Sequence, residues 1–173
     1  GALSHLEALI RMTDERNPDQ LIMPAHFIQP AEKSGRILDI DRWVIHEVLR
    51  RLAENPAIPS IAINLSGRSL SEPSLPQYIG DELREAGVNP ARLIVEITET
   101  AAVSDLHDAQ RLIEALRQLG CGVSLDDFGV GFASFAYLKH LAVDTIKIDG
   151  IFIRDLANDP DNQVFVQAMV SVA

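Results

Sequence analysis

The stretch RLIVEIT, residues 92–98, sets one carboxylate among large apolar side chains, because Glu96 stands between Val95 and Ile97. Side chains alternate between the two faces of a strand, so Val95 and Ile97 face one way and Glu96 the other. In an open sheet with helices on both faces, such a glutamate would be buried without an obvious partner. In a (β/α) barrel the same face points inward, where barrel enzymes build their sites. The stretch therefore favours an α/β fold of the TIM-like barrel type.

The same pattern recurs in other expected strands. SIAINLS at residues 60–66 places Asn64 among isoleucine and leucine, and DTIKIDG at residues 144–150 places Lys147 between two isoleucines. Polar groups at the carboxyl ends of barrel strands converge on one mouth of the barrel. The residues that we expect to meet there are Glu7, Asn64, Glu96, Asp126 and Lys147.

Strands and helices alternate along the chain, which implies parallel strands. Strands are expected in residues 3–12 (ending near Glu7), 60–66, 92–98, 122–128 and 144–150, and helices in residues 41–54, 75–86, 105–119, 134–141 and 161–173. This order corresponds to about five of the eight strand–helix units of a TIM barrel. Ser104 is a candidate N-cap of the helix 105–119, and residues 17–24 and 70–76 are interpreted as loops.

Composition indicates one globular domain with a substantial core. Of the 173 residues 47% are hydrophobic and 23% are charged, which argues against disorder. The formal net charge of −10 disfavours a long nucleic acid as partner, since phosphate binding relies on an excess of Lys and Arg. The single cysteine, Cys121, cannot form an internal disulfide, and no apolar run is long enough to span a bilayer. We expect a cytoplasmic location, and a parent protein anchored in the membrane by other segments is compatible with it.

The two adjacent acids in SLDDFGVGFASF, residues 124–135, call for a cation. Asp126 and Asp127 repel each other, and each raises the other's pKa unless positive charge lies between them. Carboxylates with an amide oxygen suit Mg²⁺ or Mn²⁺, and adjacent aspartates can serve two ions. Gly129 and Gly131 would let the following loop fold close over a ligand.

Several motifs now stand in one order along nearly the whole chain. They are HLEALIRM, MPAHFIQPAEKSG, DRWVI, NLS, EITET, DDFGVGFAS and YLKHLAVDTIKID. This order and spacing resemble the EAL domain family, bacterial phosphodiesterases that hydrolyse cyclic di-GMP to the linear dinucleotide pGpG. The resemblance implies a TIM-like barrel with one irregular strand, one or more Mg²⁺ or Mn²⁺ ions (two in our interpretation) and a homodimer. It also implies fusion to sensory or GGDEF-type domains in the full-length protein.

The resemblance further implies a role for each residue that matches a motif position. Metal ligation is implied for Glu7, Asn64, Glu96, Asp126 and Asp127. Catalytic roles are implied for Lys147, Glu99 and Asp127. Lys147 would position or activate the attacking water, and Glu99 would brace the loop after Asp127. Leu9, Arg11 and Asp149 would contact the dinucleotide, with Arg11 on a phosphate.

The chain also departs from the family pattern. Residues 1–173 begin after the strand that usually carries Gln-Pro and stop before the seventh and eighth strands, so we interpret them as a partial EAL domain. The seventh-strand glutamate of the family therefore has no counterpart here. Val130, Phe132 and Ala133 replace the usual Thr, Tyr and Ser of the glycine loop.

Other interpretations stay open for single residues. Asn64 alone is compatible with an Asx turn, Asp126 and Asp127 with a helix cap, and Arg11 with a surface ion pair. Trp43 and Phe27 are expected in the core. For the whole domain, the alternatives are a catalytically silent cyclic di-GMP receptor and an unrelated barrel that uses Lys147 as the base of an enolate mechanism.

Overall fold

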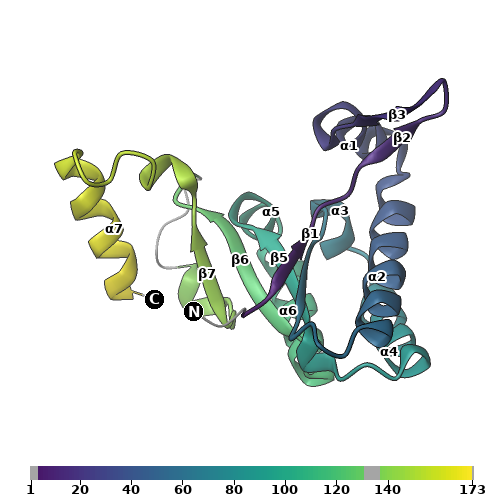
Figure 1. Cartoon of the computed structure of the whole chain (residues 1–173). Helices are drawn as coiled ribbons and strands as arrows, with labels where there is room; N and C mark the ends of the chain where they lie inside the picture. The colour runs from purple at the N-terminus through teal and green to yellow at the C-terminus, as the bar shows by residue number, and fades with distance from the viewer. Residues whose placement is uncertain (1–3, 131–136, 173) are drawn as a thin grey trace.

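The β-rich stretches between the helices form one parallel sheet. The computed structural model describes residues 4–130 and 137–172. Five strands lie side by side in the order β1-β4-β5-β6-β7, and all neighbours are parallel (Figure 1). Their bounds are β1 Leu6–Ala8, β4 Ile61–Asn64, β5 Leu93–Thr98, β6 Gly122–Phe128 and β7 Thr145–Ile148. The α/β fold with a parallel sheet is confirmed.

Seven α-helices and three short 3-10 helices connect the strands in the described part of the chain. The α-helices are α1 Pro24–Ser34, α2 Ile37–Glu54, α3 Gly67–Leu70, α4 Leu75–Ala86, α5 Glu99–Ser104, α6 Leu106–Leu119 and α7 Pro160–Val172. The 3-10 helices are η1 Pro90–Arg92, η2 Leu138–His140 and η3 Gly150–Phe152. Helices α2, α4 and α6 gather beside the sheet, whereas α7 lies at the opposite side of the molecule (Figure 1).

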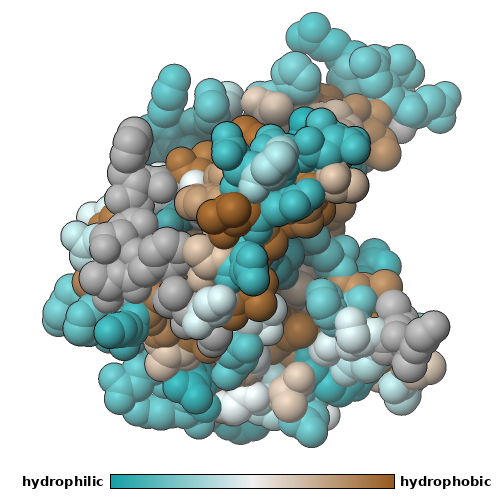
Figure 2. Space-filling view, turned by 90° about the vertical axis from the view of Figure 1, so that its left-hand side faces the viewer, coloured by the Kyte–Doolittle hydropathy of each residue, from teal (hydrophilic) through white to brown (hydrophobic). Residues whose placement is uncertain are grey.

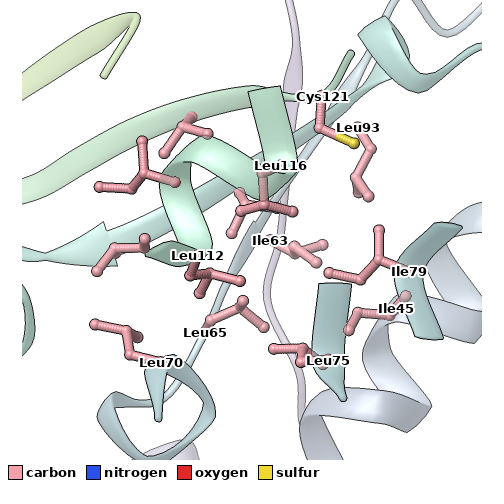
Figure 3. Packing of buried hydrophobic residues seen from close by; sticks show 14 of the residues in the cluster. Ile45, Ile63, Leu65, Leu70, Leu75, Ile79, Leu93, Leu112, Leu116 and Cys121 are labelled. Carbon is pink, nitrogen blue, oxygen red and sulfur yellow. The ribbon is translucent and has the colours of Figure 1, made fainter. Parts of the chain in front are cut away.

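The large apolar side chains of the strands pack against these helices. Ile63, Val95 and Leu125 are buried on the helix side of the sheet, as the period-two pattern predicts. Their partners come from three helices, and Figure 3 shows Ile45, Leu75, Ile79, Leu112 and Leu116 converging on this side. Burying this face leaves the opposite face of the sheet to the polar strand residues.

Parallel pairing aligns the polar residues of the other face. Asn64 pairs with Glu96 between β4 and β5, and Glu96 pairs with Ser124 between β5 and β6. Thr98 pairs with Asp126 one step closer to the carboxyl ends of the same strands. The register therefore brings polar groups from neighbouring strands together near the carboxyl ends of these strands.

The prediction that residues 17–24 form a loop is wrong. Residues Asn17–Ile22 form β3, which pairs antiparallel with β2 (Met12–Asp14) and projects at the upper right of Figure 1. The turn residues Glu15 and Arg16 allow the chain to reverse there, and the amide of Arg16 donates to the carboxylate of Asp14. An Asx-type turn at Asp14 is thus the local signal for the hairpin.

Two smaller predictions also need correction. Asp105, not Ser104, caps α6, because its carboxylate accepts from the amide of Asp108, while the Ser104 hydroxyl donates to the carbonyl of Thr100. Trp43 is 58% exposed rather than in the core, since it lies beside the apolar stripe of α2 and not on it. Phe27 is buried as expected. Of the expected helix 134–141, residues 134–136 lie outside the described residues, and Leu138–His140 form η2.

The described surface alternates between polar and apolar areas. Brown apolar patches lie among teal polar ones on the face that is to the left in Figure 1 (Figure 2). Ile151, Val164 and Val170 of the carboxyl-terminal part are among the large apolar residues that are exposed. None of the helices in the described ranges has both the length and the apolar character that crossing a bilayer would require.

Candidate functional site

Three carboxylates from three strands meet on the polar face of the sheet. One ligand oxygen each from Glu7 of β1, Glu96 of β5 and Asp126 of β6 lies within 4.8 Å of the others. Glu96 is only 2% exposed, and burial raises the pKa of its carboxyl although a hydrogen bond from Lys147 opposes the shift. Such a concentration of negative charge needs a cation nearby.

Lys147 of β7 supplies positive charge to this cluster. Its Nζ atom lies 2.8 Å from Glu96 Oε2, 3.1 Å from Asp126 Oδ2 and 3.7 Å from Glu7 Oε2. Burial alone would lower the pKa of Lys147, but the hydrogen bonds to Glu96 and Asp126 outweigh it and raise the pKa. The amine is therefore an ammonium group at neutral pH and donates to the carboxylates.

Asn64 joins the cluster from the end of β4. Its Nδ2 atom donates to Glu7 Oε1 over 2.8 Å, so its amide group lies against the first carboxylate. Its amide oxygen is a ligand atom of the kind that Mg²⁺ and Mn²⁺ accept. The structure thus brings together five of the residues named from the sequence, Glu7, Asn64, Glu96, Asp126 and Lys147.

Asp127 lies outside the group of three carboxylates. Its backbone φ is 54°, and its amide donates to the side chain of Asp126. Burial raises the pKa of Asp127, and the charges of Asp126 and Asp149 add to this effect. Asp149 accepts from the amide of Ile151 at the start of η3. The left-handed backbone turns Asp127 toward Asp149 rather than into the cluster, so its role in metal binding stays a prediction.

Glu99 reaches the end of β6 from the start of α5. Its Oε2 atom accepts from the amide of Gly129 over 3.0 Å, and the side chain is 2% exposed. Gly129 has a φ of 103° and directly follows β6. Residues 131–136, which include Gly131, Phe132 and Ala133, lie outside the described residues. The bond between Glu99 and Gly129 fixes the backbone directly after β6.

A cavity opens next to Asn64 and is bordered by residues of α1 and α2. Its volume is ≈ 340 Å³, and its lining includes Leu9, Arg11, Asn64 and Thr98. Leu9 is 62% exposed, and Arg11 donates to the carbonyl of Ile10. Leu9 and Arg11, predicted as dinucleotide contacts, thus lie next to the candidate metal ligands.

One lining residue of this cavity was not singled out from the sequence. Asp41 of α2 is 4% exposed and accepts hydrogen bonds from Ser66 and Ser69. The signal was present, because Asp41 precedes Val44, Ile45 and Val48 on the buried stripe of α2. A charged residue at a core position of an amphipathic helix indicates a specific partner.

The residues of the cluster fit a hard divalent cation. They offer carboxylate oxygens and one amide oxygen, which Mg²⁺ and Mn²⁺ prefer, and no thiolate or imidazole lies in the group. Lys147 already shows that a positive charge is stable at this position. The cluster can therefore bind a metal ion.

Comparisons with known proteins point to one family. A family model described as EAL domain matches residues 1–173. The chain is 36% identical over 176 residues to the bifunctional diguanylate cyclase/cyclic di-GMP phosphodiesterase MucR of Pseudomonas aeruginosa, covering 99% of the chain and 25% of MucR. It is 40% identical over 162 residues to the cyclic di-GMP phosphodiesterase PdeF of Escherichia coli, covering 91% of the chain and 21% of PdeF.

Solved structures agree with this assignment. The structure described as PaMucR phosphodiesterase, c-di-GMP complex, superimposes with a TM-score of 0.89 at 35% identity. The match covers 99% of this chain and 70% of that one. The chain therefore shares the TIM-like fold of that structure while spanning about a quarter of the length of the curated MucR.

Proposed function

The chain belongs to the EAL domain family, and from this premise we propose that it is a phosphodiesterase domain that hydrolyses cyclic di-GMP to linear pGpG with Mg²⁺ or Mn²⁺. The observation that carries the proposal is the meeting of Glu7, Glu96 and Asp126 around one cationic position. A receptor that had lost catalysis would not need to keep these three carboxylates together at this place. Similarity to named phosphodiesterases supports the reaction class.

Glu7, Asn64, Glu96 and Asp126 would hold the metal, with Asp127 as an additional ligand. When bound, the ion supplies Lewis acidity toward the phosphate and acidifies a water molecule. The reaction breaks one bond between phosphorus and a ribose 3′ oxygen and forms one bond between phosphorus and the water oxygen. Lys147 holds the buried side chain of Glu96 in one orientation, so this ligand is already ordered before a metal ion binds.

The other residues would position the dinucleotide and its water. Lys147 donates hydrogen bonds and stabilises negative charge near the reacting phosphate. Arg11 offers a guanidinium group at the cavity, which suits a phosphate oxygen, and Leu9 offers apolar surface. Glu99 restrains Gly129, and Asp149 lies near Asp127 on the other side.

The domain would act within a larger cytoplasmic signalling protein. MucR is named for both a diguanylate cyclase and a phosphodiesterase, and the present chain corresponds to 25% of its length. We expect the full-length protein to carry sensory or GGDEF-type domains and to form a homodimer. Strands outside residues 1–173 would close the barrel.

Hydrolysis of cyclic di-GMP by the full-length protein tests the proposal. We expect pGpG to form with Mg²⁺ or Mn²⁺ and to stop after chelation, and Glu96→Gln should abolish the reaction. A matched control is Glu114→Gln, which changes an exposed acid of α6 outside the site. Unchanged turnover after exhaustive chelation would overturn the metal mechanism. Tight binding of cyclic di-GMP without turnover would identify a receptor instead.

A further inference from the structure

Asp41 is a buried carboxylate that the reaction described above does not use. It lies in the second turn of α2, and a single oxygen, Oδ2, accepts three hydrogen bonds. The donors are the amide of Ser66 at 3.1 Å, the hydroxyl of Ser66 at 2.6 Å and the hydroxyl of Ser69 at 2.6 Å. Such a buried charge is costly unless its partners are fixed in place.

These three donors belong to one turn, which follows β4. Ser66 is the N-cap of α3 and accepts from the amide of Ser69, so Asp41 and Ser66 together organise the start of this helix. The amide of Leu65 donates to the carbonyl of Glu96 on β5. The residue before Leu65 is Asn64. The turn after Asn64 is therefore held by α2 through Asp41 and by β5 through the carbonyl of Glu96.

The charged form of Asp41 is tolerated in this buried position only because the serine hydrogen bonds stabilise it. Desolvation raises the pKa of Asp41, and the hydrogen bonds from Ser66 and Ser69 act against this shift. Glu32 of α1 also lines the cavity and adds a repulsive charge. Without the serine donors nothing among these neighbours would offset the cost of the buried carboxylate.

We infer that Asp41 is a positioning residue, which holds the turn after β4 so that Asn64 keeps its amide group against Glu7 and its oxygen ready for a divalent cation. This inference rests on the proposed function of the cluster. Asp41 acts through Ser66 and the backbone and does not itself contact the cation or the reacting phosphate. A partner that fixes a metal ligand in this way contributes about 10- to 100-fold to metal affinity in other proteins.

Titration of Mn²⁺ alone into the full-length protein tests the inference without relying on hydrolysis. Asp41→Ala should weaken Mn²⁺ binding about tenfold, which is the lower end of the loss in metal affinity that follows when the partner of a metal ligand is removed. Asp41→Asn keeps an acceptor oxygen for the serine donors and should restore most of the affinity. Asp39→Ala is the matched control, because Asp39 lies on the same helix with a side chain that is 66% exposed and pairs only with Arg36 in the described residues.

A double-mutant cycle with Asn64 separates positioning from direct contact. In the Asn64→Ala background, Asp41→Ala should cause no further loss of Mn²⁺ affinity beyond about twofold, because the group on which it acts is gone. Additive losses would overturn the inference. A further loss of affinity for cyclic di-GMP when Asp41→Ala is added to Asn64→Ala would also overturn the inference. Such a loss would mean that Asp41 contacts the dinucleotide in the cavity.

A merely structural role gives a different pattern. It would lower the unfolding midpoint in Asp41→Ala and leave Mn²⁺ affinity unchanged well below that midpoint, which contradicts the inference. If Asp41→Ala does not fold, Ser69→Ala removes one of the three donors at the other end of the network. That variant should weaken Mn²⁺ binding in the same direction, and an unchanged affinity would overturn the inference. A protein that binds Mn²⁺ as expected without hydrolysing cyclic di-GMP would contradict the proposed reaction alone.

Discussion

At the scale of single residues, the contacts of Lys147 indicate its role in the reaction. It contacts carboxylates from three other strands and lies where an added cation would also be attracted. Lys147→Ala should therefore reduce turnover of cyclic di-GMP far more than its binding, because a group that stabilises the transition state acts on kcat. Its removal should not weaken Mn²⁺ binding, since the amine competes with the ion for the same oxygens. Steady-state kinetics and Mn²⁺ titration measure both effects.

Arg11 serves as the contrasting variant. Its guanidinium lies at the cavity and not in the carboxylate cluster, so Arg11→Ala should weaken dinucleotide binding first and change kcat less. Equal losses of binding and turnover in Lys147→Ala would instead assign Lys147 to substrate binding.

Much of the cluster was predictable from the sequence, because strand periodicity places Glu7, Asn64, Glu96, Asp126 and Lys147 on one face. The position of Asp127 was not predictable, since it depends on a left-handed backbone conformation that the neighbouring residues in the sequence do not indicate. Asp41 was missed for another reason. Its partners Ser66 and Ser69 are more than twenty residues away, and only packing of α2 on the β4–α3 turn brings them together.

At the scale of elements, Gly129 joins three parts of the fold. It directly follows β6 with a φ of 103°, and a Cβ atom there would lie 2.7 Å from Phe152 of η3 and close to the tip of Met169 on α7. Met169 can move, but the ring of Phe152 also packs on Phe165, with ring centroids 4.7 Å apart. Gly129→Ala should therefore destabilise the protein by about 2–5 kcal/mol, from backbone strain and overpacking together.

Gly87→Ala is the matched control for this variant. Gly87 ends α4 with a φ of 63°, but nothing lies within 4 Å of the added Cβ atom. It should cost only about 1–2 kcal/mol of backbone strain. Denaturant unfolding measures both losses, and hydrogen exchange in residues 150–172 should increase only in Gly129→Ala. Equal losses in the two variants would mean that contact with η3 and α7 contributes nothing.

Cys121 reports on the packing of α6 against the sheet. It precedes β6, is 5% exposed and lies beside Leu93 and Leu116 in Figure 3, and burial raises the pKa of its thiol to about 11. The unfolded thiol ionises first as the pH rises above its ordinary value of 9.0, so stability should fall between pH 9 and about 11. Each unit of difference in pKa corresponds to about 1.4 kcal/mol.

The measurement is the free energy of unfolding against pH in the wild type and in Cys121→Ala. The variant should be less stable at neutral pH, because it loses buried volume, but should lack this part of the slope. Native Cys121 should also resist alkylation at pH 8 and react after unfolding, which peptide mapping detects. Rapid alkylation of the native thiol would show that α6 does not cover it.

Element types were predictable where the apolar period was clear, as in α2, α4, α6 and the strands of the sheet. The hairpin of β2 and β3 was not, because Pro18 and Asp19 are poor strand formers and pairing with β2 overrides their propensity. Helix α5 was also missed. Its six residues Glu99–Ser104 directly follow β5 and are too few for a periodic signal.

At the scale of the whole molecule, the sheet has two free edges within the described residues. β1 and β7 each pair with one neighbour, whereas the inner strands pair with two. The related solved structure is covered to 70% by this chain. An open edge exposes unpaired backbone groups, so we propose that further strands cover both edges and complete the barrel. The carboxylates of the cluster nevertheless come from strands that already lie side by side.

A cation bound to the cluster would connect the edge strand β1 with two inner strands, which leads to a prediction about stability. The carboxylate ligands come from different strands, Glu7 from the edge strand β1 and Glu96 and Asp126 from the inner strands β5 and β6. Unfolding separates these ligands, so the ion binds the folded state alone. Mg²⁺ or Mn²⁺ at 100 times its Kd should then add about 2.7 kcal/mol to the free energy of unfolding. Thermal unfolding of the full-length protein, with and without chelator, measures this gain.

Ca²⁺ separates binding from chemistry in the same experiment. It accepts carboxylate oxygens but takes more ligands at longer distances than Mg²⁺, so it should raise the unfolding midpoint and support little hydrolysis. Glu7→Gln should reduce the stabilisation by every ion, whereas Glu114→Gln on the far side of α6 should leave it unchanged. An unfolding midpoint that does not respond to Mn²⁺ at concentrations that sustain turnover would place the catalytic metal elsewhere. Because Glu7 lies on the edge strand β1, loss of that strand would then weaken both the binding of the ion and the stabilisation that it gives.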